Sequence, residues 1–336
     1  MFAVDHTLGS GYAQQWNVAV QRELTPNTVA EIAYVGSNIT HVGIPDSNLN
    51  QLSVAQLALG NALLARVPNP YSGIVPRSST LGDPTIPVAQ LLKRYPAYTT
   101  VSLYRNNVGN TRYHGLEISA RHRFAHGLSY SASYTRSKLM DDASSVFDAS
   151  ILTGPVANYP VADSFNRKLE RDYSTGDIPH AFVSSMVWEF RGWTVAHVIT
   201  LQSGVPLAVT QATNFNAFAG FGVQRPTLVG DPTLPGDQRT PQHWFNTDAF
   251  AVTPQFAIGT ASRNPVRGPS YRNVDLAVMR RFPARRGAFE VRAEIFNLLN
   301  TPPLGAPAAV LGAANFGTIT SAGDPRVAQL ALKFLF

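Results

Sequence analysis

Apolar and polar residues alternate in many segments of this chain, and the last segment shows the pattern most simply. From Val327 to Phe336 one face carries Ala328, Leu330, Leu332, Phe334 and Phe336, and the other carries Gln329, Ala331 and Lys333. A period of two residues predicts a β-strand. The segment has the length of about 9–11 residues that a tilted strand needs to cross the hydrocarbon core of a bilayer. A half-buried strand of a soluble sandwich would alternate in the same way.

The same alternation predicts four hairpins earlier in the chain. Their strands are Gln15–Leu24 with Thr28–Val35, Gly115–Phe124 with Leu128–Thr135, Phe182–Phe190 with Trp193–Gln202, and Tyr271–Phe282 with Ala288–Asn297. Short turns rich in Gly, Pro or Asn join the two strands of each hairpin. In the third strand His122 is the one polar residue on the apolar face, opposite Glu117, Ser119 and Arg121.

Long connections alternate strictly with these short turns. They cover residues 37–111, 139–177, 204–269 and 299–326. Tight periplasmic turns and long outer loops are typical of bacterial outer-membrane barrels. The sequence therefore predicts an all-β fold, an antiparallel transmembrane β-barrel segment with long extracellular loops and short periplasmic turns.

The connection 37–111 is predicted to carry two short helices. Ser53 is suited to cap the first, which Pro68 ends, and Pro87 opens the second, which Pro96 ends. A short additional strand is expected between Val101 and Tyr104.

The strand count indicates an incomplete barrel. Nine strands cannot close by antiparallel pairing, because the first and ninth would run parallel, and single-chain bacterial barrels have even strand numbers. Their unpaired edges would be left in lipid, where no water satisfies them. Residues Met1–His6 lack the features of a signal peptide. We expect residues 1–336 to be the C-terminal part of a larger barrel, a fragment without its signal and earlier strands.

The composition agrees with this interpretation. Charged residues make up 14% of the chain, against roughly 25% in a typical soluble domain, and there are 25 Gly and 24 Pro. No apolar run reaches the roughly 18 residues of a membrane helix. With 0 Cys, disulfides and thiolate metal sites are excluded. The net charge of +6 comes from scattered basic residues, so no nucleic-acid partner is expected.

Seven segments form an ordered set from about Gly11 to Phe336. They are GYAQQWN at 11–17, QREL at 21–24, AYVGS at 33–37, DIPH at 177–180, RNPVRGP at 263–269, RAEIFNLLN at 292–300 and FGTITSA at 316–322. The set resembles the barrel portion of Oar-like TonB-dependent outer-membrane receptors. The resemblance implies an intact barrel of about 22 strands, filled by an N-terminal plug and energised through the TonB complex of the inner membrane. A carboxypeptidase-regulatory-like domain often precedes that plug.

The resemblance also implies a function and partners. It implies uptake or surface binding of a bulky nutrient, such as an oligosaccharide or peptide, with a structural or adhesive surface protein without transport as the alternative. We recognise no plug, TonB-contacting box or leading domain within residues 1–336. Outer-membrane lipid is an expected partner. Phe336 resembles the C-terminal aromatic signal of the barrel-assembly machinery.

Two groups of polar residues are weak candidates for catalysis. Asp141 and Asp142 would form half of a protease site, and His180 with Ser184 or Ser185 would form a hydrolase site. Solvated loop acids and wall residues are the favoured interpretations, because no sequence partner completes either site. We expect no enzyme, no cofactor and no metal site, since the acids of residues 163–177 lack the spacing of an EF-hand.

Aromatic residues of the loop 204–269 are the candidate ligand contacts, because their rings stack on sugars and peptides. They are Phe215, Phe218, Phe221, His243, Trp244 and Phe245. Packing of the loop onto itself is the favoured alternative. The aromatic residues near strand ends are predicted to form interface girdles; these are Trp16, Tyr34, Tyr130, Trp188 and Trp193.

Overall fold

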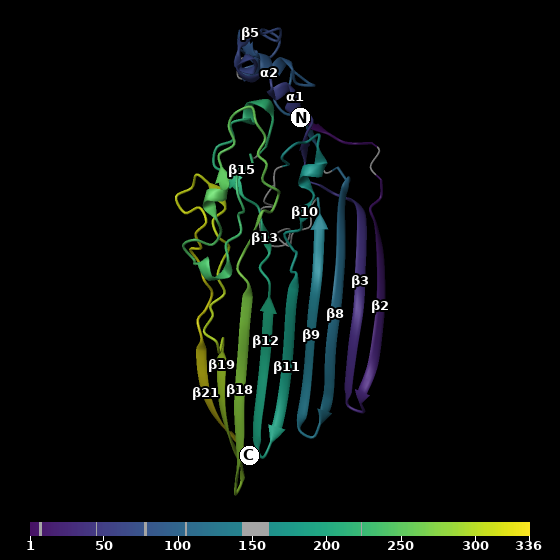
Figure 1. The fold of residues 1–336 in the computed structure, drawn as a ribbon, viewed down its shortest axis with the longest axis vertical. Coiled ribbons are helices and arrows are strands. Elements are labelled where there is room, and N and C mark those ends of the chain that lie inside the picture. The colour runs from purple at the N-terminus through teal and green to yellow at the C-terminus, as the bar shows by residue number, and fades with distance from the viewer. Residues whose placement is uncertain (7–8, 45, 77–78, 105, 143–160, 223) are drawn as a thin grey trace.

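A single curved wall of β-strands dominates the molecule (Figure 1). The computed structural model describes residues 1–6, 9–44, 46–76, 79–104, 106–142, 161–222 and 224–336. Within these ranges nine long strands pair antiparallel in chain order. They are β2 (Tyr12–Thr25), β3 (Thr28–Val42), β8 (Gly109–Ala125), β9 (Leu128–Asp141), β11 (His180–Phe190), β12 (Trp193–Gln202), β18 (Tyr271–Ala284), β19 (Gly287–Phe296) and β21 (Val327–Leu335). The predicted antiparallel all-β fold is confirmed.

Short turns and long connections lie at opposite ends of the wall. The four hairpin turns lie at the lower end in Figure 1, together with the C-terminus, and the N-terminus lies at the upper end. In His126-Gly127 and Arg191-Gly192 both residues have positive φ, between 47° and 82°. That backbone is the type I′ turn, whose twist matches the twist of paired strands. The predicted alternation of short and long connections is therefore confirmed.

Five strands continue further into the upper end than predicted. β2 starts at Tyr12 and β11 at His180, and the other three are extended by more residues. β3 extends to Val42, β8 starts at Gly109 and β9 runs to Asp141, so the first long connection is 43–108 instead of 37–111. The added residues pair through their backbones, as in Asn38 with Arg112. Backbone pairing does not need apolar side chains, so these strands continue beyond the apolar band from which their ends were predicted.

The register separates the wall into two chemically different faces. On what we call the outward face, Ile32 pairs with Ile118, which pairs with Tyr134. On the inward face the neighbouring row is Glu31, Ser119 and Ser133. Successive residues of a strand point to opposite sides, so this division continues along every strand.

His122 lies on the outward face, as its position in the alternation predicts. Its Nδ1 is 2.8 Å from the Thr28 hydroxyl, and its ring stacks on Tyr130 at 5.4 Å. A neighbouring hydroxyl thus satisfies one ring nitrogen of a polar residue on an apolar face.

The first long connection carries two short helices. α1 (Val54–Leu57) begins at Ser53, which forms a reciprocal capping box with Gln56. Gly60, with φ of 56°, breaks the predicted continuation, and a 3₁₀ turn follows at Gly60–Leu64. α2 (Val88–Leu91) is one turn long. No helix in the described ranges is long and apolar enough to span a membrane.

Small strands join the remaining segments at the upper end. β1 (Phe2–Ala3) pairs with β7 (Ser102–Leu103), which also pairs with β4 (Ser47–Asn48). The other pairs are β5 (Arg66–Pro68) with β6 (Thr85–Pro87), β13 (Pro206–Leu207) with β17 (Val266–Arg267), β14 (Thr210–Gln211) with β20 (Val310–Leu311), β15 (Thr227–Leu228) with β16 (Phe250–Ala251), and β10 (Asp172–Tyr173) with β9. Further 3₁₀ turns occupy Thr80–Gly82, Arg167–Glu170, Ala217–Ala219, Gly236–Gln238 and Thr247–Ala249.

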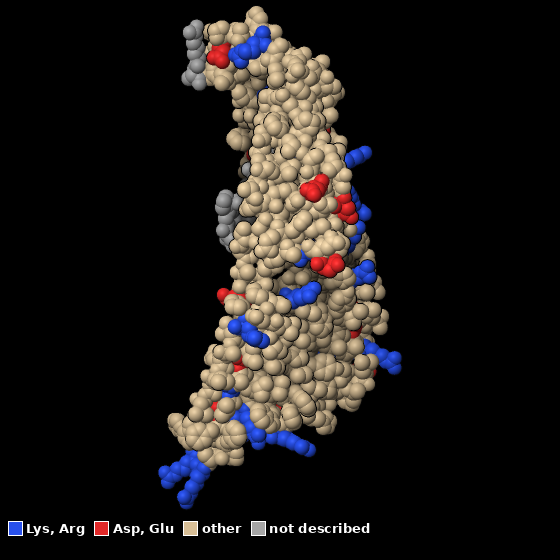
Figure 2. Space-filling model, turned by 60° about the vertical axis from the view of Figure 1, so that its left-hand side comes forward, with Lys and Arg blue, Asp and Glu red and all other residues tan. Residues whose placement is uncertain are grey.

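Aromatic residues lie near both ends of the outward face. At the upper end the Tyr34 hydroxyl is 2.7 Å from His114 Nδ1, and the Trp16 ring lies 6.1 Å from the same histidine. At the lower end Arg280 lies over the rings of Trp193 and Phe282, at 4.7 and 5.0 Å. Figure 2 shows a face with few charged side chains above a lower tip rich in Lys and Arg.

We predict that Gly36→Ala destabilises the wall by about 1–3 kcal/mol through overpacking. A Cβ at this position would lie 2.1 Å from Trp16 Cε2, so the indole has to move. Urea unfolding in lipid vesicles, followed by tryptophan emission, measures the effect. Gly230→Ala is the control, because its Cβ would meet its nearest atoms at 3.7 Å.

The double variant Gly36→Ala/Trp16→Ala tests the cause. It is expected to be no less stable than Trp16→Ala alone, because the clashing ring is gone. A Gly36→Ala protein with unchanged stability and unchanged emission would contradict the prediction.

Candidate functional site

The long connections pack together above the wall, and we call residues 43–108, 161–179, 203–270 and 297–326 the loop assembly. A first apolar cluster joins the first and third of these segments through Leu52, Leu57, Leu63, Ala89, Ala219 and Phe221. A second cluster joins the third and fourth through Val209, Phe245, Phe250 and Val266, with Leu311 and Phe316 packed against it. Burial of these side chains gives the loops a common core.

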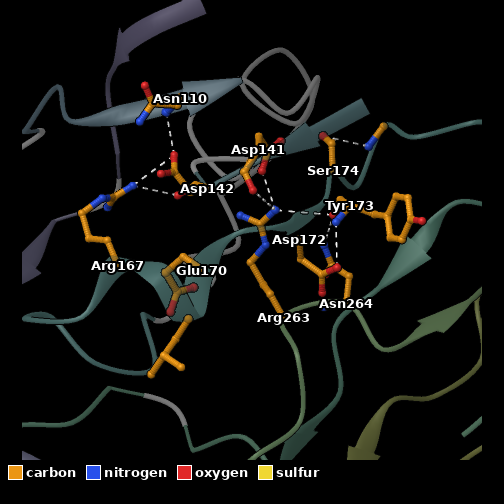
Figure 3. A network of polar contacts seen from close by, with 12 residues as sticks. Asn110, Asp141, Asp142, Arg167, Glu170, Asp172, Tyr173, Ser174, Arg263 and Asn264 are labelled. Carbon is orange, nitrogen blue, oxygen red and sulfur yellow. Dashed lines mark hydrogen bonds and ion pairs between the residues drawn. The ribbon is translucent and has the colours of Figure 1, made fainter. Parts of the chain in front are cut away.

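Buried ion pairs connect the loop assembly to the strand ends. Arg263 contacts Asp141 at the end of β9, and both side chains are buried. Arg225 pairs with Glu170 at 2.5 Å, also fully inside the protein. Because each arginine belongs to the third segment and each acid to β9 or the second segment, the pairs fix those segments to one another. Figure 3 shows the pair of Arg263 with Asp141.

The interpretation of Asp141 and Asp142 as solvated acids is wrong. Asp141 is held by Arg263, and Asp142 pairs with Arg167 at 3.1 Å and accepts from the backbone N–H of Asn110 at 2.6 Å. Charges are buried when a partner neutralises them, and that partner for Asp141 lies 122 residues away in the sequence. In the part of the chain that the structure describes, their arginine partners give both carboxylates a structural role.

Two of the segments behind the family resemblance contact each other. Asp177, with 0% of its side chain exposed, pairs with Arg267 at 2.5 Å and accepts from the Leu139 N–H at 2.6 Å. Asn264 donates its amide to the Tyr173 carbonyl at 2.7 Å, and its backbone N–H to Asp172 at 2.8 Å. The 177–180 and 263–269 segments together anchor the loops on the wall.

The candidate serine and histidine residues do not form a catalytic pair. His180 Nδ1 is 2.7 Å from the Tyr134 hydroxyl. Ser184 faces outward, 3.3 Å from His197 Nε2, and Ser185 lies on the inward face, as their alternation predicts. The described residues contain no group of three His, Asp or Glu side chains placed to hold a metal ion.

Most of the candidate ligand-contacting aromatics pack inside the loop assembly. Phe218 and Phe221 belong to the first cluster, and Trp244 and Phe245 to the second. The indole N–H of Trp244 donates to the Arg267 carbonyl at 2.8 Å. The other two, Phe215 and His243, are exposed. Of the six candidates, these two are the most accessible from solvent.

Some residues that shape the site give no signal in the sequence. Buried Asn216 accepts from the Phe256 N–H at 2.8 Å and donates to the Ala257 carbonyl at 2.7 Å, so it replaces missing strand pairing. Lys93 is also buried, and its ammonium donates to the Thr99 carbonyl at 3.1 Å. Burial lowers the pKa of Lys93 from its usual 10.5. In a polar loop sequence these residues look like solvated ones.

The inward face of the wall has a broad hollow of about 560 Å³, lined by both polar and apolar side chains. Its charged and hydroxyl side chains come from five strands and include Arg121, Arg123, Ser131, Ser185, Asp275 and Glu294. Charges of both signs suit polar contacts more than binding of a purely apolar ligand.

The chain is similar to known outer-membrane proteins. A family model described as an outer membrane beta barrel domain matches residues 1–329. Among solved structures, the outer membrane transporter YddB from Escherichia coli is 13% identical over 98% of this chain and 33% of its own, with a TM-score of 0.44. The ferripyoverdine receptor of Pseudomonas aeruginosa is 13% identical over 97% of this chain and 27% of its own, with a TM-score of 0.44. This chain thus spans about a third or less of those chains, and no curated protein matches it.

We predict that Asp177→Ala loosens the loop assembly by about 2–4 kcal/mol, because it leaves Arg267 and the Leu139 N–H without their partner. Hydrogen exchange of residues 263–269 measures the loss. Asp83→Ala is the control: its pair with Arg66 is about half exposed, so its effect is expected to stay below about 1 kcal/mol. Equal exchange in both variants would refute a special role for Asp177.

Proposed function

The chain belongs to the outer membrane beta barrel domain family, and on that premise we propose that it forms part of the barrel of a TonB-dependent receptor for a bulky nutrient. The outer membrane is its location. The observation that carries the proposal is the packed loop assembly above a two-faced wall, because a rigid outer surface over a polar interior suits capture followed by passage.

A larger barrel is part of the proposal. β2 and β21 are the two edges of the nine-stranded path, and they run in the same direction. Antiparallel pairing between them is therefore impossible, and edges left open in hydrocarbon would be costly. We infer that further strands complete the barrel, with residues 1–336 as its C-terminal part and the helix-bearing loop as an insertion.

The proposed nutrient is an oligosaccharide or a peptide. Both classes offer flat or polar surfaces on which exposed rings stack. Phe215, with 39% of its surface exposed, and His243 are the residues proposed to contact it, while the four packed aromatics hold the loop in shape.

The proposed partners follow from the same assignment. Transport would draw energy from the TonB complex, through parts of the receptor other than the described wall. The barrel-assembly machinery is proposed to recognise Phe336, whose ring is fully exposed and stacks on Phe334 at 6.3 Å. No catalytic role is proposed for this chain.

The test is uptake of fluorescent oligosaccharide and peptide pools by cells with the intact gene and by a deletion strain. We expect the deletion to abolish uptake of one pool, and a protonophore to stop uptake without stopping surface binding. Loss of cell adhesion with unchanged uptake of both pools would favour the structural or adhesive alternative instead.

A Phe215→Ala/His243→Ala variant is expected to weaken surface binding by roughly 3- to 10-fold, because two stacking rings are lost. Val229→Ala in the same segment is the matched control, since Val229 is exposed to solvent, like Phe215 and His243, and lacks a ring. Binding that is unchanged in the double variant would remove these two residues from the ligand site.

A further inference from the structure

Four basic side chains gather on the outward face at its upper edge. Arg112 lies on β8, Arg136 and Lys138 lie on β9, and Arg171 directly precedes β10. In the register Lys138 pairs with His114 and Arg136 with Leu116, on the same side as Ile118 and Tyr134. All four basic residues are exposed. We call Arg112, Arg136, Lys138 and Arg171 the upper cationic patch.

The patch lies immediately above the apolar band of the wall. Leu116 and Ile118 follow Arg112 on the outward side of β8, toward the lower end of the wall, and Tyr134 lies below Arg136 on β9. The hydroxyls of Tyr34 and Tyr134, each bound to a histidine at 2.7 Å, mark the same height. Tyrosines of this kind lie at the boundary between hydrocarbon and headgroups. The patch is therefore level with the headgroups of the outer leaflet.

No carboxylate of the described residues forms an ion pair with the patch. Lys138 lies over the Tyr173 ring at 5.2 Å. The neighbouring acids have other partners: Asp142 binds Arg167, and Asp172 accepts from the backbone N–H of Asn264. Within the described residues the charge of the patch is therefore accessible to an external anion.

A small cavity of about 140 Å³ opens beside Arg112 and Arg171. Asn38, Thr40, Asn110, Thr111 and Met140 also line it, with Asp142 and Asp141, which pair with Arg167 and Arg263, at one side. The Thr40 hydroxyl is buried there and has no hydrogen-bond partner among the described residues. A water occupies about 30 Å³, so the cavity has room for a phosphate group and a water molecule. A phosphate oxygen would accept from that hydroxyl.

We propose that the upper cationic patch binds the phosphate group of a glycolipid in the outer leaflet. Arginine pairs with phosphate through two parallel hydrogen bonds, and lysine attracts it as a point charge. Basic residues beside a membrane surface attract anionic headgroups, and here the acyl chains would lie along the apolar band below. The site is on the outside of the wall, so it does not depend on what the receptor transports.

The test measures binding of lipopolysaccharide to the purified protein in dodecyl maltoside at low salt. Arg112→Gln/Arg171→Gln is expected to lower the affinity by about 10-fold or more, and Thr40→Val by about threefold. Arg22→Gln/Arg272→Gln is the matched control. It removes the same charge from the outward face away from the patch and is expected to change affinity less than twofold. Unchanged heat-modifiable migration in gels confirms that each variant folds.

Two further probes identify the source of the anion. Lipopolysaccharide stripped of its lipid phosphates is expected to bind the unchanged protein as weakly as the intact glycolipid binds the arginine double variant. Inorganic phosphate at about 10 mM, roughly tenfold above the upper end of typical KM values for small molecules, is expected not to displace the intact glycolipid. Equal loss in the control double variant would overturn the proposal. So would equal binding of the stripped glycolipid, or displacement by inorganic phosphate.

Discussion

The lack of water in the hydrocarbon core is the constraint on which this structure depends. Backbone N–H and C=O groups there have no solvent partner, so each has to be paired within the protein. The long strands satisfy it by continuous antiparallel pairing, for example through ten consecutive residue pairs from Ala181–Gln202 to Phe190–Trp193. The outward face can then be apolar and the inward face polar, because side chains take no part in that pairing.

Above the hydrocarbon core water is present, so backbone groups can bond to solvent. The long segments there gain little stability from forming extended strands. The loops are ordered by a shared apolar core and by buried arginine–carboxylate pairs. Such pairs cost desolvation and add modest net stability, but they fix geometry, since a displaced partner leaves a buried charge. The pairs of Arg263 and Arg267 lie where strands end and loops begin, so the wall orients the loop assembly.

The strands and their faces could be predicted from the sequence, because a period of two residues is a local property. The outward position of His122 and the opposite faces of Ser184 and Ser185 followed in this way. The contacts of the loops could not. Asp141 looked solvated because its partner Arg263 is far away in the chain. The burial of Phe245 depends on Phe250 and Phe316, whose ring centroids lie 5.9 and 5.2 Å from its own. Long-range partners decide burial, and local pattern carries no information about them.

Cysteine labelling tests the central claim, that the wall spans the membrane with its Ile118 face toward lipid. The chain has 0 Cys, so single cysteines report one position each. A fluorophore attached at Ile118→Cys or Ala132→Cys should be quenched by brominated acyl chains in vesicles, and one at Ser119→Cys or Ser133→Cys should not. Equal quenching at neighbouring positions, or quenching only at the two serine positions, would contradict the account.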